Sequence, residues 1–415
     1  MERPFSQKED SPIFQPPTAE GRQGDNPTAS LCEEHYKRPA VSRARPFDDW
    51  NLFVSCNSTR RLLVPREGNY PGDVGEPHPL RSVVSIGLAF TGLWVLGHEC
   101  GHGGLTNSKY FNDMIGFILH TALWTPYFSW KISHHRHHCN HASMDRDEVF
   151  VPNTRADLGI PDETQQCVSY DDLLEDTPLY SLFCIVGCQV LGFPAYIGGF
   201  QRVWPKKISE VDQSSESYEF IMIIWPVSQR IIANCLLFSR EQRSAVILSD
   251  AGLIAMAVLF TSLSLNYGFG AIIKLYLIPW FAVTHWVGLA TYLQHTDPVV
   301  PRYRQGAWNF TRGATATIDR DFLGWQGRFF LHGVSHHHVV HHFFPKLPFY
   351  NAQAATDHLK KFMGEYYMYS DKPVFRALWD TFRTCLFVDN QGDVVFFRDR
   401  KGRAARRVIN QQKAI

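Results

Sequence analysis

The chain has 415 residues, and its 41 lysines and arginines balance 40 aspartates and glutamates to a formal net charge of +1. This charge creates no overall field that would attract nucleic acid or a strongly acidic ligand, so we expect no nucleic-acid partner. Histidine is the unusual residue type, because ten of the 19 histidines fall in two short stretches, 134–141 and 336–342.

The N-terminal part of the chain is polar. Residues 1–45 are rich in proline and charge, which predicts a disordered arm, and residues 46–79 contain no long apolar run. The apolar segment from Val83 to Gly97 predicts a helix roughly 22 Å long, shorter than a hydrocarbon core of roughly 30 Å. We therefore expect this helix to dip into the membrane interface, with both termini on the cytosolic side.

The clearest membrane spans are predicted later in the chain. Val246 to Ser264 and Ala271 to Leu293 are long and apolar, and a short turn joins them. A hairpin of two spans returns the chain to the side on which it started. The apolar segment from Leu179 to Phe200 is interrupted by glycine and proline and is expected at the interface or buried. Residues 391–415 form a basic tail, which favours the cytosolic side.

The first histidine cluster follows the short apolar helix. His98 and His102 are four residues apart, so they lie on one face of a helix and can reach the same metal ion. Taken alone, the pair also matches the HExxH pattern of zinc proteases, in which Glu99 would be the general base.

The second and third clusters share the pattern HxxHH, in which offsets of three and four place the imidazoles on one helical face. Together the three clusters offer too many imidazoles for one tetrahedral zinc ion, which indicates two metal ions. Imidazole also binds copper, iron and nickel, so the ligand type leaves the metal open. The predicted ligands are His98, His102, His134, His137, His138, His338, His341 and His342.

Further residues near the clusters are candidates for supporting roles. His295 lies where the last span leaves the membrane, and we interpret it as a ninth ligand or as an interfacial residue. Carboxylates after the second cluster would hydrogen-bond to ligand N–H groups and fix their tautomers, or would form a solvated acidic loop. These carboxylates are Asp145, Asp147 and Glu148, and the histidines expected outside the ligand set are His135, His141, His336 and His337.

The sequence resembles the delta-12/omega-3 membrane fatty-acid desaturases, on the fungal side of that family. The resemblance covers roughly residues 80–205 and 240–390. The matching segments are Gly92–His102, Pro126–Lys131, Arg146–Pro152, Thr291–Thr296 and His338–Phe344. It implies a non-haem diiron centre with two Fe ions, O2 as the oxidant, and electrons from NADH through cytochrome b5 reductase and cytochrome b5 at the endoplasmic reticulum.

The resemblance also implies an all-α integral membrane protein, with a transmembrane stem beneath a cytosolic cap that holds the irons. The expected reaction converts oleoyl to linoleoyl chains carried on phospholipid or CoA. An omega-3 desaturase acting on linoleoyl chains, and an acyl hydroxylase or acetylenase, are the alternatives. A zinc protease would leave both HxxHH clusters without a role.

The desaturase domain is expected at 46–390, and it departs from the family at 46–82 and 210–240. Relatives have two spans before the first cluster, whereas this chain shows one short apolar run there. Residues 220–238 are apolar where the family has a short polar stretch, so we interpret them as an insertion.

Overall fold

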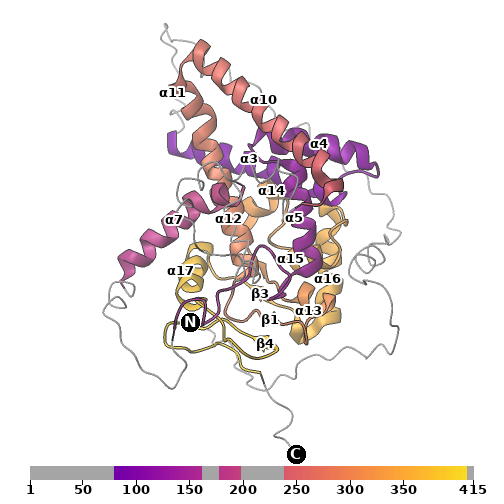
Figure 1. Ribbon diagram of the computed structural model, residues 1–415, viewed down its shortest axis with the longest axis vertical. Coiled ribbons are helices and arrows are strands. Elements are labelled where there is room, and N and C mark those ends of the chain that lie inside the picture. Colours follow the sequence, from indigo (N-terminus) through magenta and orange to yellow (C-terminus); the bar gives the residue numbers. More distant parts are fainter. Residues whose placement is uncertain (1–78, 161–176, 198–237, 409–415) are drawn as a thin grey trace, which may run out of the picture.

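The computed structural model describes residues 79–160, 177–197 and 238–408, and this part of the chain is largely helical (Figure 1). The predictions of a disordered arm at 1–45, of a missing span in 46–79 and of an insertion at 220–238 lie outside the described residues, apart from the edge residues Pro79 and Phe238. The sequence therefore remains the sole basis for those three predictions.

The first described helix is longer than the sequence predicts. Helix α3 extends over Pro79–His102, 24 residues, and so reaches about 36 Å. The prediction of a short helix was wrong because the apolar run marks only its middle. The helical hydrogen bonding continues at the C-terminal end through the first histidine cluster, and the helix ends where Gly103 adopts a φ of 72°. Its length therefore gives no argument against crossing a membrane.

The next two helices pack against α3, and the second of them carries the second cluster. Helix α4, Lys109–Ala122, begins at Ser108, whose side chain accepts a hydrogen bond from the backbone of Phe111. Helix α5, Tyr127–Asn140, contains the second cluster within its last two turns. A left-handed residue, Trp124, turns the chain between them.

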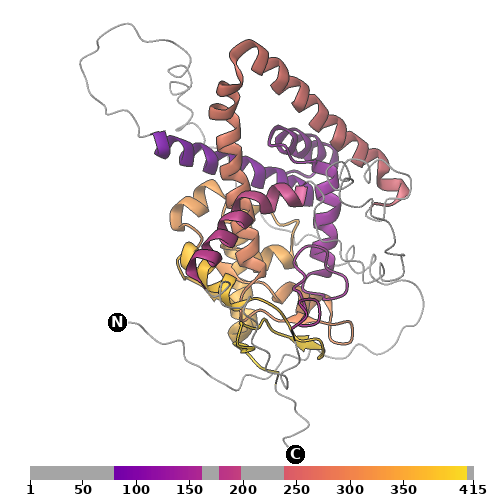
Figure 2. The ribbon, with the colours of Figure 1, turned by 60° about the vertical axis from the view of Figure 1, so that its left-hand side comes forward.

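Two long apolar helices form the predicted hairpin. Its elements are η3 (Arg240–Gln242), α10 (Arg243–Tyr267), α11 (Phe269–Ile272), η4 (Ile273–Leu277, a π-helical turn) and α12 (Ile278–His295). Of the described helices, two continuous stretches are long and apolar enough to cross a membrane: Arg240–Tyr267 and Phe269–His295. They contain the predicted spans, and Gly268 makes the turn. Figure 2 shows the tip of the hairpin, where α10 and α11 meet, extending away from the other helices.

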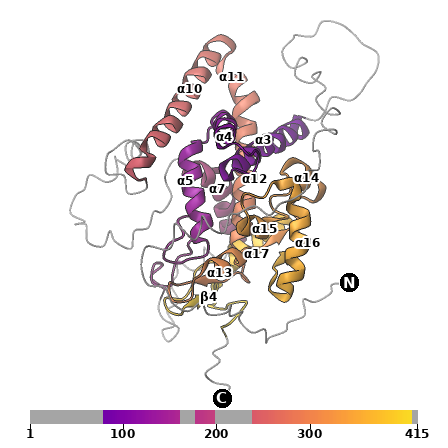
Figure 3. The same ribbon diagram turned by 90° about the vertical axis from the view of Figure 1, so that its right-hand side faces the viewer.

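Helix α12 connects the hairpin to the rest of the molecule. It packs against α3 and against α7, Pro178–Ile197, an apolar helix that continues through Pro194. The buried residues Leu289 and Leu293 pack against Phe322 and Leu331 of the C-terminal half. Figure 3 shows α12 between α5 and α15 in this view. The segments that carry histidine clusters therefore meet at the lower end of α12.

Short elements complete the fold below the hairpin. The helices are α13 (Phe310–Thr315), α14 (Gly324–Phe330), α15 (His338–Phe343), η5 (Phe349–Asn351), α16 (Ala352–Met363), η6 (Gly364–Tyr366) and α17 (Val374–Thr384). Strand β1 (Arg302–Tyr303) pairs antiparallel with β4 (Val394–Val395), and β2 (Asp319–Arg320) pairs parallel with β3 (Tyr369–Ser370). The first half of the predicted basic tail therefore packs onto the body through β4.

Candidate metal centre

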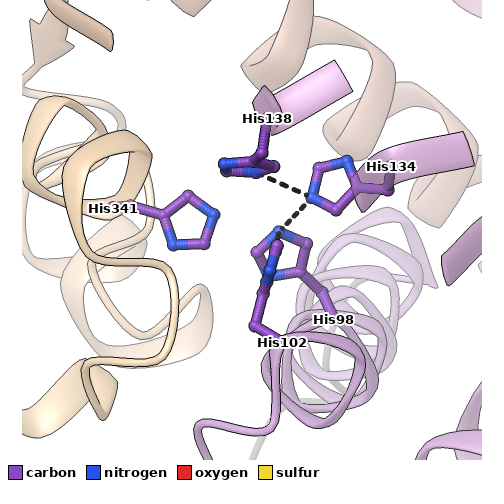
Figure 4. Close-up of side chains that lie close together, drawn as sticks. All are labelled: His98, His102, His134, His138 and His341. Carbon is purple, nitrogen blue, oxygen red and sulfur yellow. Dashed lines mark hydrogen bonds between the residues drawn. The ribbon is translucent and has the colours of Figure 1, made fainter. Parts of the chain in front are cut away.

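Five imidazoles from three separate helices converge on one point. Figure 4 shows the rings turned toward one another, two from α3, two from α5 and one from α15 on the opposite side. One nitrogen of each ring lies within 4.8 Å of one nitrogen of every other ring, a separation that one metal ion could bridge. We call this set the first histidine group: His98, His102, His134, His138 and His341.

The spacing of the ring nitrogens in the first group fits ligands of a common ion. The Nε2 atom of His134 lies 2.9 Å from that of His98 and 3.2 Å from that of His138, and the Nε2 atoms of His98 and His102 are 3.3 Å apart. Metal–nitrogen bonds of about 2.1 Å place neighbouring ligand atoms about 3.0 Å apart. The residues present therefore fit a bound metal ion.

A second set of buried imidazoles lies beside the first. The Nε2 atoms of His295 and His338 are 3.0 Å apart, and the Nε2 atoms of His137 and His342 have no hydrogen-bond partner among the described residues. Two overlapping triads that share His295 make up the second histidine group: His137, His141, His295, His338 and His342. The stacked rings of His138 and His342, 4.2 Å apart, form the boundary between the two groups.

Each HxxHH cluster is divided between the two groups. On α5, His134 and His138 belong to the first group and His137 to the second. On α15 the division is reversed, with His341 in the first group and His338 and His342 in the second. Residues four apart lie nearly above one another on a helix, whereas the residue between them points about a third of a turn away. The HxxHH pattern therefore lets one helix supply both groups.

Burial favours the neutral form of two ligand rings of the first group. It lowers the pKa of both His98 and His341 to about 3, because the interior penalises an imidazolium. A neutral imidazole keeps a free lone pair, which is the form that binds a metal ion. At neutral pH these two rings therefore offer uncharged nitrogens to a metal ion.

Two carboxylates orient ligand rings from behind. Burial raises the pKa of Glu99 to about 7, and its Oε1 accepts a hydrogen bond from Nδ1 of His98 at 3.1 Å. Asp147 accepts from Nδ1 of His137 at 3.0 Å. Burial alone would raise the pKa of Asp147, but its contacts with His137 and His141 outweigh burial and hold that pKa far below its usual range. Each carboxylate leaves Nε2 of the ring it contacts for the metal.

The other two predicted carboxylates have different partners. Asp145 accepts a hydrogen bond from the backbone of Gln305 at 2.9 Å, and Glu148 forms an ion pair with Arg136 at 2.8 Å. These contacts join the loop that follows α5 to the segment at Gln305 and to α5 itself. Sequence spacing cannot separate them from Asp147, because the loop makes tight turns within these few residues.

The four histidines predicted outside the ligand set have different surroundings. His135 is exposed, His336 contacts Asp321 at 3.1 Å, and His337 contacts Thr356 at 3.0 Å. His141 is the exception, because it is 1% exposed and lies within the second group. Its Nε2 faces the carbonyl oxygen of Ala316 at 2.9 Å. His141 is therefore buried beside the candidate ligands and is not a solvated residue, and its place outside the ligand set stays a prediction.

Sequence reasoning also missed two residues that support the site. Glu99 was considered only as a protease base, although its position next to His98 is the signal for a carboxylate–histidine pair. Asp319 accepts a hydrogen bond from the backbone of Val339 at 2.7 Å and contacts the Tyr367 hydroxyl, so it fixes the start of α15. No local pattern around Asp319 predicts this contact across 20 residues.

An apolar hollow adjoins the first group. Together with the open space at its mouth it encloses about 350 Å³, and Glu99 and His341 form part of its wall. The apolar part of the wall comes from Val95, Val340, Phe344, Leu347, Phe349 and Ala352. The hollow therefore places apolar space next to candidate metal ligands.

Comparison with known proteins identifies the family. The sequence model described as fatty acid desaturase matches residues 77–206 and 217–373. This chain belongs to the fatty acid desaturase family. The resemblance stated from its motifs is confirmed, and the desaturase is an oxidoreductase and not a zinc protease.

Curated relatives of this desaturase include several activities. It is 39% identical over 318 residues to a Delta(12) fatty acid desaturase of Mortierella isabellina, with 75% of each chain covered. An oleate hydroxylase of Claviceps purpurea is 37% identical over 345 residues, covering 78% of this chain and 70% of the relative. An acyl-lipid (9+3)-(E)-desaturase of Dimorphotheca sinuata is 34% identical over 325 residues, covering 76% of this chain and 77% of the relative.

Proposed function

We propose that this desaturase is a diiron enzyme of the membrane that converts oleoyl chains to linoleoyl chains. The observation that carries the proposal is the pair of adjacent histidine groups in a chain of this family. Support for the position of the new double bond comes from two Mortierella relatives named Delta(12) fatty acid desaturase, each 39% identical over 318 residues.

The two groups are proposed to hold one iron ion each. His98, His102, His134, His138 and His341 would bind the first ion, and His137, His295, His338 and His342 the second. Bound iron would supply the O2-dependent redox chemistry that removes two hydrogen atoms from an unactivated acyl chain. The protein orients the ligand rings through Glu99 and Asp147.

The hollow beside the first group is proposed to receive the acyl chain. The apolar part of its wall would contact a hydrocarbon chain that lies beside His341. The depth to which the chain enters then selects the carbon atoms that face the iron ions, so positioning determines the position of the double bond. Because this wall faces the hydrocarbon chain, it does not distinguish an acyl chain on phospholipid from one on CoA. We therefore propose an acyl lipid of either kind as the substrate.

The membrane arrangement is proposed from the hairpin and the charges. Arg240–Tyr267 and Phe269–His295 would cross the endoplasmic reticulum membrane, with the histidine groups on the cytosolic side. Support comes from the apolar side chains that α10 exposes, such as Ile254 and Val258, and from the basic C-terminal segment. Cytochrome b5, reduced by NADH-cytochrome b5 reductase, is the proposed electron donor.

Expression in yeast tests this function, because yeast lacks polyunsaturated fatty acids. We expect linoleate to accumulate without any added fatty acid, as measured by gas chromatography. The control is the His138→Ala variant at the same protein level, which should make none. A product that appears only when linoleate is fed would favour the omega-3 alternative. Hydroxylated or acetylenic C18 acids would favour a relative of the oleate hydroxylase type instead.

A further inference from the structure

A buried arginine lies directly beneath the second histidine group. Arg302 is 1% exposed and is among the largest fully buried side chains of the described residues. Its Nη2 donates a hydrogen bond to the backbone carbonyl of His295 at the end of α12. Its Nε and Nη1 have no hydrogen-bond partner in the part of the chain that the structure describes. An isolated buried charge is costly, so its position calls for a reason.

Three segments fix this side chain in place. Strand β1 pairs Arg302 with Val395 of β4. The neighbouring Tyr303 exchanges backbone hydrogen bonds with the loop after α5, at 2.9 Å to Ala142 and 2.8 Å to Met144. The Phe397 ring lies 5.7 Å from the guanidinium. The backbone around Arg302 therefore joins the second cluster, the C-terminal segment and the end of α12.

The buried carboxylate of Asp147 acts on the charge of Arg302. Burial lowers the pKa of Arg302 to about 10, and attraction to Asp147 opposes this effect and so favours the charged guanidinium. Asp147 in turn holds Nδ1 of His137, a proposed ligand of the second ion. The two charged residues contact different members of the second group. Asp147 contacts the His137 ring, and Arg302 contacts the backbone carbonyl of His295.

We propose that Arg302 is a positioning residue of the second metal site, which anchors His295 and supplies a fixed positive charge that offsets Asp147. This inference rests on the proposed diiron function. A positive charge beside a metal ion favours its more reduced state, because each added electron lowers the local positive charge. Loss of the charge shifts the reduction potential of the metal centre to more negative values, and loss of the anchor weakens metal binding.

Two substitutions separate the charge from the anchor. Arg302→Met keeps the length and removes both, whereas Arg302→Lys keeps the charge and loses the planar fork of donors. In the full-length protein purified in detergent and loaded with ferrous iron, we expect Arg302→Met to bind one of its two ions about tenfold more weakly. Its midpoint potential should be more negative than that of the unaltered protein. The midpoint potential of Arg302→Lys should lie close to that of the unaltered protein, whereas its iron affinity should recover less.

Arg304→Met is the matched control. The Arg304 guanidinium donates to the backbone carbonyls of Asp389, Asn390 and Gly392, so it anchors the same C-terminal segment away from the second group. We expect its iron content and potential to match those of the unaltered protein. Equal iron content and potential for Arg302→Met and Arg304→Met would overturn the inference. If Arg302→Met does not fold, Arg302→Lys decides the question. An iron affinity equal to that of the unaltered protein would overturn the anchoring role, and a clearly more negative midpoint potential would overturn the role of the charge. Absence of iron from the unaltered protein would instead contradict the proposed function.

Discussion

At the scale of single residues, Glu99 and Asp147 make the same contact with different electrostatics. Each accepts a hydrogen bond from Nδ1 of a candidate ligand. Burial raises the pKa of Glu99 to about 7, so its carboxyl group is partly protonated near neutral pH. Asp147 stays ionised, because its contacts with His137 and His141 outweigh the effect of burial. The contact of Glu99 with His98 therefore depends less on a negative charge than the contact of Asp147 with His137.

The contrast predicts unequal effects of amide substitution. Asp147→Asn removes a charge that the site uses, and we expect it to weaken iron binding roughly 10- to 100-fold. Glu99→Gln resembles the protonated form already present and should have a smaller effect. Iron content per chain and linoleate formation measure both. Asp145→Asn and Glu148→Gln serve as controls and should retain iron, and an equal loss in all four variants would contradict the assignment.

The ligand histidines predict a second pattern. Replacing His138 or His341 by alanine should abolish product while the protein level persists. The ligands act as one unit, so a double variant should be scarcely worse than either single variant. His135→Ala is the internal control, because His135 is exposed although it lies in the same cluster. Full activity in either of the ligand variants would refute the proposed first site.

At the scale of elements, the sequence indicated the histidine helices and the hairpin but not their exact roles. Spacing alone predicted that α5 and α15 each present three imidazoles, since helical periodicity is local. It did not predict that each cluster divides between two groups, because that depends on how α5 and α15 face each other. The length of α3 was underestimated, since tertiary packing extends a helix beyond its apolar run.

Helix α16 predicts how the hollow limits the acyl chain. Ala352 begins this helix and lines the hollow, whereas Ala354 is exposed on the same helix. Ala352→Phe should fill apolar space and lower conversion of C18 chains more than that of shorter chains, with iron content unchanged. Ala354→Phe should leave the product profile as it was. Fatty-acid profiles from yeast fed acids of different length provide the measurement, and identical profiles for both variants would exclude the hollow as the acyl site.

At the scale of the whole molecule, buried histidines make the stability of the metal-free protein depend on pH. Burial lowers the pKa of His98, His120 and His341 to about 3, against about 6.5 in an unfolded chain. Between these values the unfolded chain binds protons that the folded chain does not. Stability is therefore fully present above pH about 6.5 and falls toward pH about 3, by about 1.4 kcal/mol per pH unit for each such histidine. Glu99 and Asp319, whose pKa burial raises to about 7, act in the opposite direction but are outnumbered.

Thermal unfolding of metal-free protein between pH 8 and 5 tests this dependence. We expect the midpoint temperature to fall as the pH is lowered. His120→Gln should reduce the dependence of the midpoint temperature on pH by the contribution of one histidine. This reduction is expected even if the substitution also lowers stability at pH 8. His135→Gln should reduce this dependence less than His120→Gln, since His135 is exposed and burial lowers its pKa to a smaller extent. A midpoint that rises on acidification would contradict the argument.

The division of each HxxHH cluster between the two groups has a consequence for how the enzyme is assembled. If each group holds one ion, as proposed, the first ion would draw in ligands from both α5 and α15 and so would order the remaining ligands of the other group. The second ion then binds to a site already formed, which makes loading cooperative. Titration with ferrous iron below saturation should give a mixture of empty chains and chains with two ions, and native mass spectrometry would count them. Half-filled chains as the main species would show that the two sites fill independently.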